Sequence, residues 1–299
     1  MAGSIQDGII PAEDVTVTSF NIRSSNMDKN TPHDWTNRKS GVFAWFNENL
    51  HPFVLTQECS EDQRNDVLNN RSAYDAVYYA GSSSWWDQFL GKDTDAPVVT
   101  FYKKDDVTVH SSGTFWLVEG APTSPQKTST QNQERCATWL KCTYKDKKMV
   151  LINAHVSYRT KNGDTGDADD NPMQALREYE MGVIKSWVSN TANYNPSVDG
   201  PVVLAGDFNI NQGNKMFDTW KDNNDGSGWY YARTTAYNND KNSSDTGRTF
   251  NGWGESEGTI DHQFYSGFSD VASYRIDREP YAGVQYISDH WPVSVVYKF

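Results

Sequence analysis

Short apolar runs alternate with amphipathic stretches along most of this chain. Between Val15 and Phe20, apolar and polar side chains alternate with the period of a β-strand. Residues 38–50 and 60–70 fit helices, with a short apolar strand at 52–59 between them. Further strands are predicted at 74–80, 97–103, 113–118, 201–209, 260–265, 270–276 and 291–299. The first part of the chain therefore alternates strands with helices.

The middle of the chain adds a hairpin, a long helix and two polar insertions. Residues 134–156 fit two strands that turn at 145–147, and residues 171–190 carry one apolar helical face. Segments 159–172 and 221–248 are rich in Asn, Asp and Gly, which predicts surface loops. This combination of elements predicts mixed sheets covered by helices, an α/β (α+β) architecture.

The chain shows no internal boundary rich in Pro, Gly and Ser. We therefore expect a single domain over residues 14–299, preceded by a loose leader at 1–13. The leader lacks the charged start and apolar core of a secretion signal. No apolar run approaches the roughly 18 residues of a membrane span, so we expect none.

Composition narrows the class of protein. Aromatic residues make up 13% of the 299 residues, which excludes a disordered chain. Lys and Arg number 27 against 39 Asp and Glu, a net charge of −12. So acidic a chain is a poor candidate for non-specific tracking along a nucleic-acid backbone. A phosphate ester bound locally at a metal ion is still compatible with this charge.

Disulfides are not expected to hold this fold. The three cysteines are Cys59, Cys136 and Cys142, an odd number. Cys136 and Cys142 fall in one predicted strand, which at about 3.3 Å per residue places them roughly 20 Å apart. The cysteines therefore do not indicate whether the protein works in a reducing or an oxidising compartment.

Polar side chains recur where apolar strands begin or end. The strand-end residues are Asn21, Glu58, Asn153, His155, Asp207, Asn209, Asp261, Asp289 and His290. Strand ends in layered α/β folds present side chains to a cleft. Glu, Asp and Asn oxygens suit Mg²⁺ or Mn²⁺, and histidines suit proton transfer and phosphate contact. This set of side chains is typical of metal-assisted phosphoester hydrolysis.

Seven short motifs carry a family resemblance over roughly residues 14–299. In order they are SFNIR, TQE, TFYKKD, NAH, GDFN, ID near 260 and SDH near the C-terminus. Their order resembles the endonuclease/exonuclease/phosphatase superfamily, which includes the DNase I-like nucleases. DWTNRK and SGTFWL are similar to a branch of bacterial, often exported hydrolases. The resemblance implies a four-layer α/β/β/α sandwich, with two mixed, mostly antiparallel sheets face to face and helices outside.

The resemblance also implies a divalent-metal site. Glu58 would be the principal ligand, with Asn21 beside it and Asp289 as a further ligand or a structural carboxylate. The metal would be Mg²⁺ or Mn²⁺, with Ca²⁺ as an alternative. Asp207 would orient or deprotonate the attacking water, or protonate the leaving oxygen. Asn209 would hold the phosphate or the nucleophile.

Two histidines complete the implied catalytic set. His290 would contact the scissile phosphate, and Asp261 would fix its tautomer through the other ring nitrogen. His155 would donate to phosphate oxygens and stabilise the developing charge. Tyr102 and Arg135 are expected on the phosphate side or behind the catalytic residues. Asn153 is expected either near the substrate or only as a brace for the His155 strand, and Trp253 is expected to flank the cleft.

The remaining conspicuous residues have plain structural interpretations beside sharper ones. His33, His51, His110 and His262 are expected at the surface or in the core, although His262 stands where the family more often has Tyr. Trp85 and Trp86 form either a hydrophobic lid or an aromatic platform. The acidic segment 164–170 is expected to be a solvated loop, because it lacks the glycine and final Glu of an EF-hand.

The sequence therefore predicts a metal-dependent phosphoric ester hydrolase: a phosphodiesterase, nuclease or phosphatase. A small phosphodiester, a nucleic acid, a phospholipid head group and a sugar-linked phosphate remain open as substrates. The alternative is a non-catalytic or carbohydrate-binding module on the same sandwich. We expect a monomer that is secreted or periplasmic.

Overall fold

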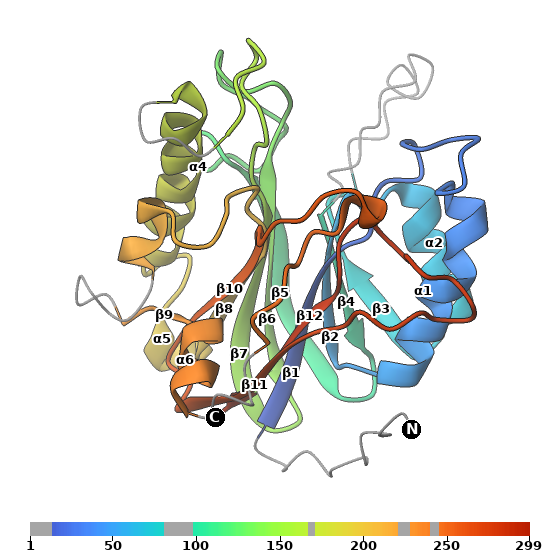
Figure 1. The fold of residues 1–299 in the computed structure, drawn as a ribbon. Coiled ribbons are helices and arrows are strands. Elements are labelled where there is room, and N and C mark those ends of the chain that lie inside the picture. The colour runs from blue at the N-terminus through green and yellow to red at the C-terminus, as the bar shows by residue number, and fades with distance from the viewer. Residues whose placement is uncertain (1–13, 81–97, 167–170, 221–227, 240–244) are drawn as a thin grey trace.

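The computed structural model describes residues 14–80, 98–166, 171–220, 228–239 and 245–299. Two six-stranded sheets face each other across the middle of the molecule, and helices lie on their outer faces (Figure 1). The predicted four-layer sandwich is confirmed. None of the helices in the described ranges is long and apolar enough to cross a membrane.

The first sheet contains a single parallel pair. Its strands, in spatial order, are β11 (Asp270–Ile276), β12 (Val293–Lys298), β1 (Asp14–Asn21), β2 (Phe53–Gln57), β4 (Val98–Lys103) and β3 (Tyr74–Val77). Only β1 and β2 run parallel, and their register pairs Asn21 with Gln57. The carboxyl ends of these two strands therefore lie side by side, and the residues that follow them emerge at the same edge.

The second sheet repeats this arrangement. Its strands, in spatial order, are β5 (Val107–Trp116), β6 (Cys136–Tyr144), β7 (Lys147–His155), β8 (Val202–Asp207), β10 (Asp261–Ser266) and β9 (Tyr230–Tyr231). The parallel pair is β7 and β8, which places His155 opposite Asp207. Strand β10 is antiparallel to β8, and its first residue, Asp261, pairs with Asp207. One edge of this sheet thus gathers three polar strand ends.

Capping side chains define where the helices begin. The helices are α1 (Trp35–Asn49), α2 (Glu61–Asn70), α4 (Pro172–Ser189), α5 (Pro196–Asp199) and α6 (Ala232–Asn239), with 3₁₀ turns η1 (Lys215–Thr219) and η2 (Gly252–Gly254). Ser60 and Gln63 form a capping box at the start of α2. The Asn171 side chain accepts from the amide of Met173 and caps α4, which has Pro172 in its first turn.

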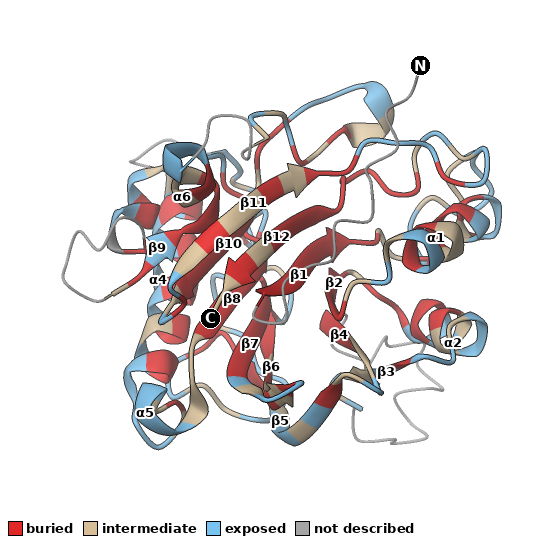
Figure 2. Ribbon diagram, turned by 90° about the horizontal axis from the view of Figure 1, so that it is seen from below, coloured by how far each residue is buried: buried red, intermediate tan, exposed pale blue. Residues whose placement is uncertain are grey.

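Apolar side chains fill three layers of core. One cluster lies between the sheets, and two others lie beneath the outer helices, around Trp45 on α1 and Trp187 on α4. Figure 2 shows the central strands largely buried and the exposed residues concentrated on the outer sides of the helices and in loops. The sandwich therefore buries both faces of its central strands.

A buried amide pair joins the two sheets. Gln57 Nε2 donates to Asn153 Oδ1 at 2.7 Å, which links β2 to β7. Asn153 Nδ2 donates in turn to the carbonyls of Thr56 and Val99, at 3.0 and 3.1 Å. Both side chains are completely buried. Hydrogen bonding of this kind offsets the cost of placing amides inside an apolar core.

Several predicted boundaries were wrong, for local reasons. Helix α1 begins at Trp35 rather than 38, because the Asp34 side chain accepts from the amide of Thr36 at 2.9 Å and caps it there. Strand β5 begins at Val107 rather than 113; its first half is largely exposed and has a register shift between Val109 and Ser111, so its pattern is weak.

The polar segment 221–248 is not a loop throughout. Its described part contains helix α6, in which Ala232 and Ala236 are buried in the core between the sheets. Such small side chains give little apolar periodicity, which explains the wrong prediction. Residues 221–227 and 240–244 of this segment lie outside the described residues. The same holds for the leader at 1–13, for residues 167–170 of the acidic segment, and for Trp85 and Trp86. All three cysteines are buried free thiols.

Candidate functional site

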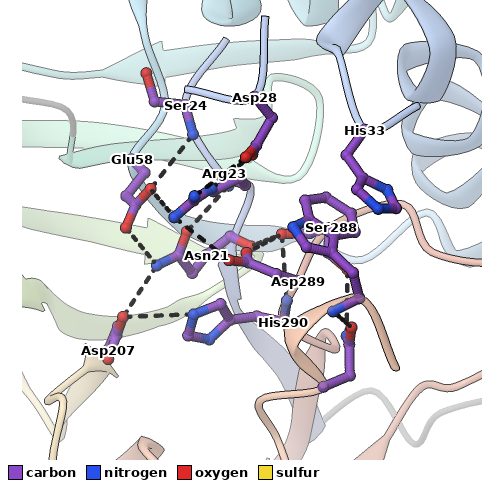
Figure 3. Close-up of polar contacts among 12 residues, drawn as sticks. Asn21, Arg23, Ser24, Asp28, His33, Glu58, Asp207, Ser288, Asp289 and His290 are labelled. Carbon is purple, nitrogen blue, oxygen red and sulfur yellow. Dashed lines mark hydrogen bonds and ion pairs between the residues drawn. The ribbon is translucent and has the colours of Figure 1, made fainter. Parts of the chain in front are cut away.

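The polar strand ends of the two sheets meet around the carboxylate of Asp207. This residue ends β8 and is 1% exposed. Its Oδ2 accepts a hydrogen bond from Asn21 Nδ2 at 2.9 Å, which joins β1 of the first sheet to β8 of the second (Figure 3). The Nε2 atoms of His155 and His290 lie 3.5 and 3.8 Å from the same oxygen. One carboxylate oxygen therefore faces an amide and two imidazoles.

Glu58 lies on the opposite side of Asn21 from Asp207. It follows β2 with a left-handed backbone, φ 57°. Asn21 Nδ2 donates to its Oε1 at 3.2 Å, and the Ser24 amide donates to its Oε2 at 3.4 Å. Arg23 and Asn209 also have left-handed backbones, at φ 55° and 53°. Strained backbone just after three strands, β1, β2 and β8, is typical of a functional site.

His290 is held by a carboxylate. Asp261 Oδ2 lies 2.9 Å from His290 Nδ1, and both side chains are buried. Burial alone would lower the pKa of His290, but the charge and hydrogen bond of Asp261, with the charge of Asp207, raise it to about 10. His290 is therefore an imidazolium at neutral pH, with its Nε2–H turned toward Asp207.

His155 has the opposite electrostatic character. Burial, the positive charge of Arg135 and that of His290 hold its pKa well below the usual value, so it is neutral. Its Nε2 lies 3.2 Å from Asn209 Nδ2, while its buried Nδ1 meets no hydrogen-bond partner among the described residues. The site thus combines one charged and one neutral imidazole.

The pKa of Asp207 depends on its burial and on the charges beside it. Burial raises its pKa to about 7, with a further contribution from Asp261, while His290 and the Asn21 hydrogen bond act against the rise. The backbone N–H of Asn209 donates to Asp207 Oδ1 at 2.8 Å, so the carboxylate cannot rotate freely. A carboxylate with a pKa near neutrality suits proton exchange with water.

Asp289 is turned away from this group and toward Arg23. Its Oδ2 lies 3.4 Å from Arg23 Nη1. Burial raises the pKa of Asp289, and the charges of His290 and Arg23 oppose that rise. Arg23 also forms a bidentate pair with Asp28, at 2.8 and 3.3 Å. Figure 3 shows Arg23 between Asp28, Glu58 and Asp289.

Among the described residues, two groups of side chains could hold a metal ion. Glu58, His155 and Asp207 offer ligand atoms within 4.8 Å of one another, and so do Asp207, Asp261 and His290. The first group fits Mg²⁺ or Mn²⁺ better: it combines two carboxylates with the Asn21 amide nearby, and Glu58 is partly open to solvent. In the second, Asp261 already binds His290. Asp289 belongs to neither group.

The structure places the four residues expected near the substrate in different environments. Arg135 is buried and its charge acts on His155. Asn153 lies between the sheets, where its amide bridges them. Tyr102 pairs with Phe53 at the start of β2, the end opposite Glu58, because β4 runs antiparallel to β2. Neither Asn153 nor Tyr102 is brought to the Asp207 group.

Trp253 lies in a segment that is hydrogen-bonded to the backbone beside His290. The carbonyl of Asp289 accepts from the amides of Asn251 and Gly252, which ties this segment to the residues around His290. The Trp253 indole stacks on the His33 imidazole, with ring centroids 4.1 Å apart and planes at 8°. His33 was expected at the surface or in the core, and neither its sequence context nor its spacing singles it out as a partner of Trp253.

The other histidines are structural in this fold. His262 is fully buried; its Nδ1 lies 2.9 Å from the Tyr231 hydroxyl and its Nε2 2.7 Å from the carbonyl of Ile210. His51 contacts the Thr18 hydroxyl, and exposed His110 contacts the Thr143 hydroxyl.

Arg23 is the residue at the site that the sequence reasoning missed, although it stands inside the SFNIR motif.

Comparisons with solved structures agree with this fold. An endonuclease/exonuclease/phosphatase from Bacteroides vulgatus is 23% identical, covers 96% of this chain and 99% of its own, and has a TM-score of 0.73. A mannosyl-6-phosphatase from Bacteroides thetaiotaomicron is 23% identical, with 95% and 100% covered and a TM-score of 0.72. Truncated TDP2 from Caenorhabditis elegans is 16% identical, with 96% and 98% covered and a TM-score of 0.66.

A search of curated proteins found no match. Residues 18–290, however, match the Endonuclease/Exonuclease/phosphatase family, and this match includes every strand end that meets at Asp207. The predicted family resemblance is therefore confirmed, and the chain belongs to the Endonuclease/Exonuclease/phosphatase family.

Proposed function

We propose that this protein hydrolyses a phosphoester with the help of a divalent metal ion. The observation that carries the proposal is the convergence on Asp207 of side chains from both sheets, with Glu58 and Asn21 on one side and His155 and His290 on the other. The family match supports the same reaction class. A site of carboxylates, amides and imidazoles suits attack by water without a covalent enzyme intermediate.

Glu58 and Asp207 would hold the metal ion, with His155 close to it, and Asn21, whose Nδ2 donates to both carboxylates, would position them. When bound, Mg²⁺ or Mn²⁺ would act as a Lewis acid that withdraws charge from a phosphoryl oxygen. Their oxygen-rich ligand set, with one side chain open to solvent, is the observation that fits such an ion.

The protein's own residues would manage protons and charge. Asp207 accepts a proton from the attacking water. The backbone N–H of Asn209 fixes the Asp207 carboxylate, and the Asn209 side chain lies beside His155. His290, charged and fixed by Asp261, donates from Nε2 to a phosphoryl oxygen or to the leaving group. Neutral His155 adds a further polar contact beside Asn209.

A sugar phosphate is the first substrate to test. The mannosyl-6-phosphatase among the structural neighbours supports this choice, and the net charge of −12 disfavours extended nucleic acids. A panel of hexose 6-phosphates, an aryl monoester, an aryl diester, plasmid DNA, RNA and sphingomyelin would be assayed with Mg²⁺, with Mn²⁺ and with chelator. Metal-dependent turnover that Glu58→Gln abolishes supports the proposal.

The control for that panel is Glu255→Gln, which removes an exposed carboxylate that follows η2 and takes no part in the Asp207 group. This variant should retain full turnover. If no substrate is turned over and the wild-type protein binds no divalent ion, the enzymatic proposal is wrong. Turnover that survives chelator would contradict the metal dependence alone.

A further inference from the structure

The Arg23 guanidinium lies among carboxylates beside the proposed metal site. Its Nη1 is 3.4 Å from Asp289 Oδ2 and 4.0 Å from Glu58 Oε2. Its Nε and Nη2 bind both oxygens of Asp28. Three acidic side chains from separate segments of the chain therefore share one fixed cation, and Glu58 is also the expected principal metal ligand.

The backbone of Arg23 is as firmly held as its side chain. Its amide donates to Asn21 Oδ1 at 3.0 Å, and its carbonyl accepts from Gln63 Nε2 at 2.9 Å and from Arg38 Nη2. Arg38 is itself buried and also donates to the carbonyls of Ile22 and Ile287. The segment that carries Arg23 is thus fastened to β1, to α2 and to the chain just before Asp289.

Asp289 shows the consequence of this arrangement. It follows Ser288 directly before His290, and the sequence predicted a metal ligand or a structural carboxylate at this position. In the structure it belongs to neither group of side chains that could hold an ion, and its Oδ2 faces Arg23. A second metal ion about 3.5–4 Å from the first would need carboxylates such as Glu58 and Asp289 to be free to bind it.

We propose that Arg23 supplies the positive charge that a second metal ion would otherwise bring, so that this site binds a single divalent ion. The inference rests on the proposed function, because it assumes that Glu58 and its neighbours bind a metal. A guanidinium suits this place: it is permanently charged, and its planar fork of donors engages several carboxylate oxygens together. Asp28, which binds that fork on its outer side, is a positioning residue for Arg23.

Counting bound Mn²⁺ tests the inference without any assay of turnover. The signal of free Mn²⁺ in electron paramagnetic resonance, titrated against the full chain, gives the number of ions bound, and calorimetry gives the affinity. We expect one ion per chain for the wild type. Arg23→Gln should bind a second ion, because Asp28, Asp289 and Glu58 lose their shared cation while the backbone contacts of residue 23 persist. Arg23→Lys, which keeps the charge, should remain at one.

The matched control is Arg278→Gln, which removes a guanidinium that pairs with Asp245 and so changes the net charge equally. It should leave the count at one. Two ions bound by the wild type would overturn the inference even if Arg23→Gln failed to fold. An unchanged count and affinity in folded Arg23→Gln would also overturn it, while leaving the proposed function intact. Failure of the wild type to bind any ion would instead contradict the proposed function, and this inference with it.

Discussion

Asp261 and His290 form a buried pair in which a carboxylate oxygen lies 2.9 Å from the imidazole Nδ1. The two residues come from different sheet edges: Asp261 begins β10, and His290 lies shortly before β12. Because Nδ1 is engaged, Nε2 is the ring atom that faces Asp207. The pair therefore fixes both the orientation and the charge of the histidine.

Asp261→Asn should reduce turnover while leaving substrate affinity nearly unchanged. The amide keeps the size of the side chain but no longer holds the imidazolium. Loss of an oriented acid–base residue costs about 10²–10⁴-fold in rate. Steady-state kcat and KM, measured on the best substrate of the panel, check this expectation. A variant with wild-type kcat would show that the pair is only structural.

Asn153→Ala should destabilise the fold without a direct effect on the chemistry. The substitution removes four buried hydrogen bonds and leaves Gln57 Nε2 without its 2.7 Å acceptor. We expect a loss of about 2–4 kcal/mol of unfolding free energy, because buried polar groups are left unsatisfied. Urea denaturation measures it. Asn70→Ala, at the exposed end of α2, is the control and should change stability by less than about 1 kcal/mol.

His51 should make the unfolding free energy depend on pH. Burial lowers its pKa to about 4 from an ordinary value of 6.5, so the unfolded chain takes up a proton first as the pH falls. This contribution is therefore fully present above pH 6.5 and is lost as the pH falls toward 4. Between pH 7.5 and 4.5 the loss amounts to about 2–3 kcal/mol.

The comparison that isolates this effect is His51→Gln, because the carboxylates titrate in both proteins. As the pH falls from 7.5 to 4.5, the unfolding free energy of the wild type should decrease by about 2–3 kcal/mol more than that of the variant. Parallel stability curves over the same range would show that His51 is protonated without cost in the folded state.

The sequence predicted the layered fold and the residues around Asp207 for the same physical reason. Strands β7 and β8 are largely apolar runs that end in a polar side chain, and β1 alternates up to Asn21, so these polar ends are visible without a structure. Parallel pairing then brings the ends of β7 and β8 together in one sheet, and the ends of β1 and β2 together in the other. Glu58 and His290 were identified in the same way, as polar residues beside strands, and the family motifs supplied the roles expected of them.

Other features depend on contacts between distant parts of the chain. Tyr102 was expected near the substrate, but the antiparallel register of β4 on β2 carries it to the far end, and a register of this kind cannot be read from either strand alone. The bridging role of Asn153 likewise requires knowledge of what faces β7. Helix α6 was missed because its buried residues, two alanines and an arginine, give no apolar periodicity.

Hydrolysis of the best substrate of the panel by the wild type and by Asp207→Asn, with Mg²⁺ and with chelator, tests the central claim most directly. Asparagine preserves the shape of the side chain but cannot accept the proton of the attacking water. We predict Mg²⁺-dependent hydrolysis by the wild type and a reduction of about 10²–10⁴-fold in the folded variant. Equal rates for the two proteins would contradict a hydrolytic site built around Asp207.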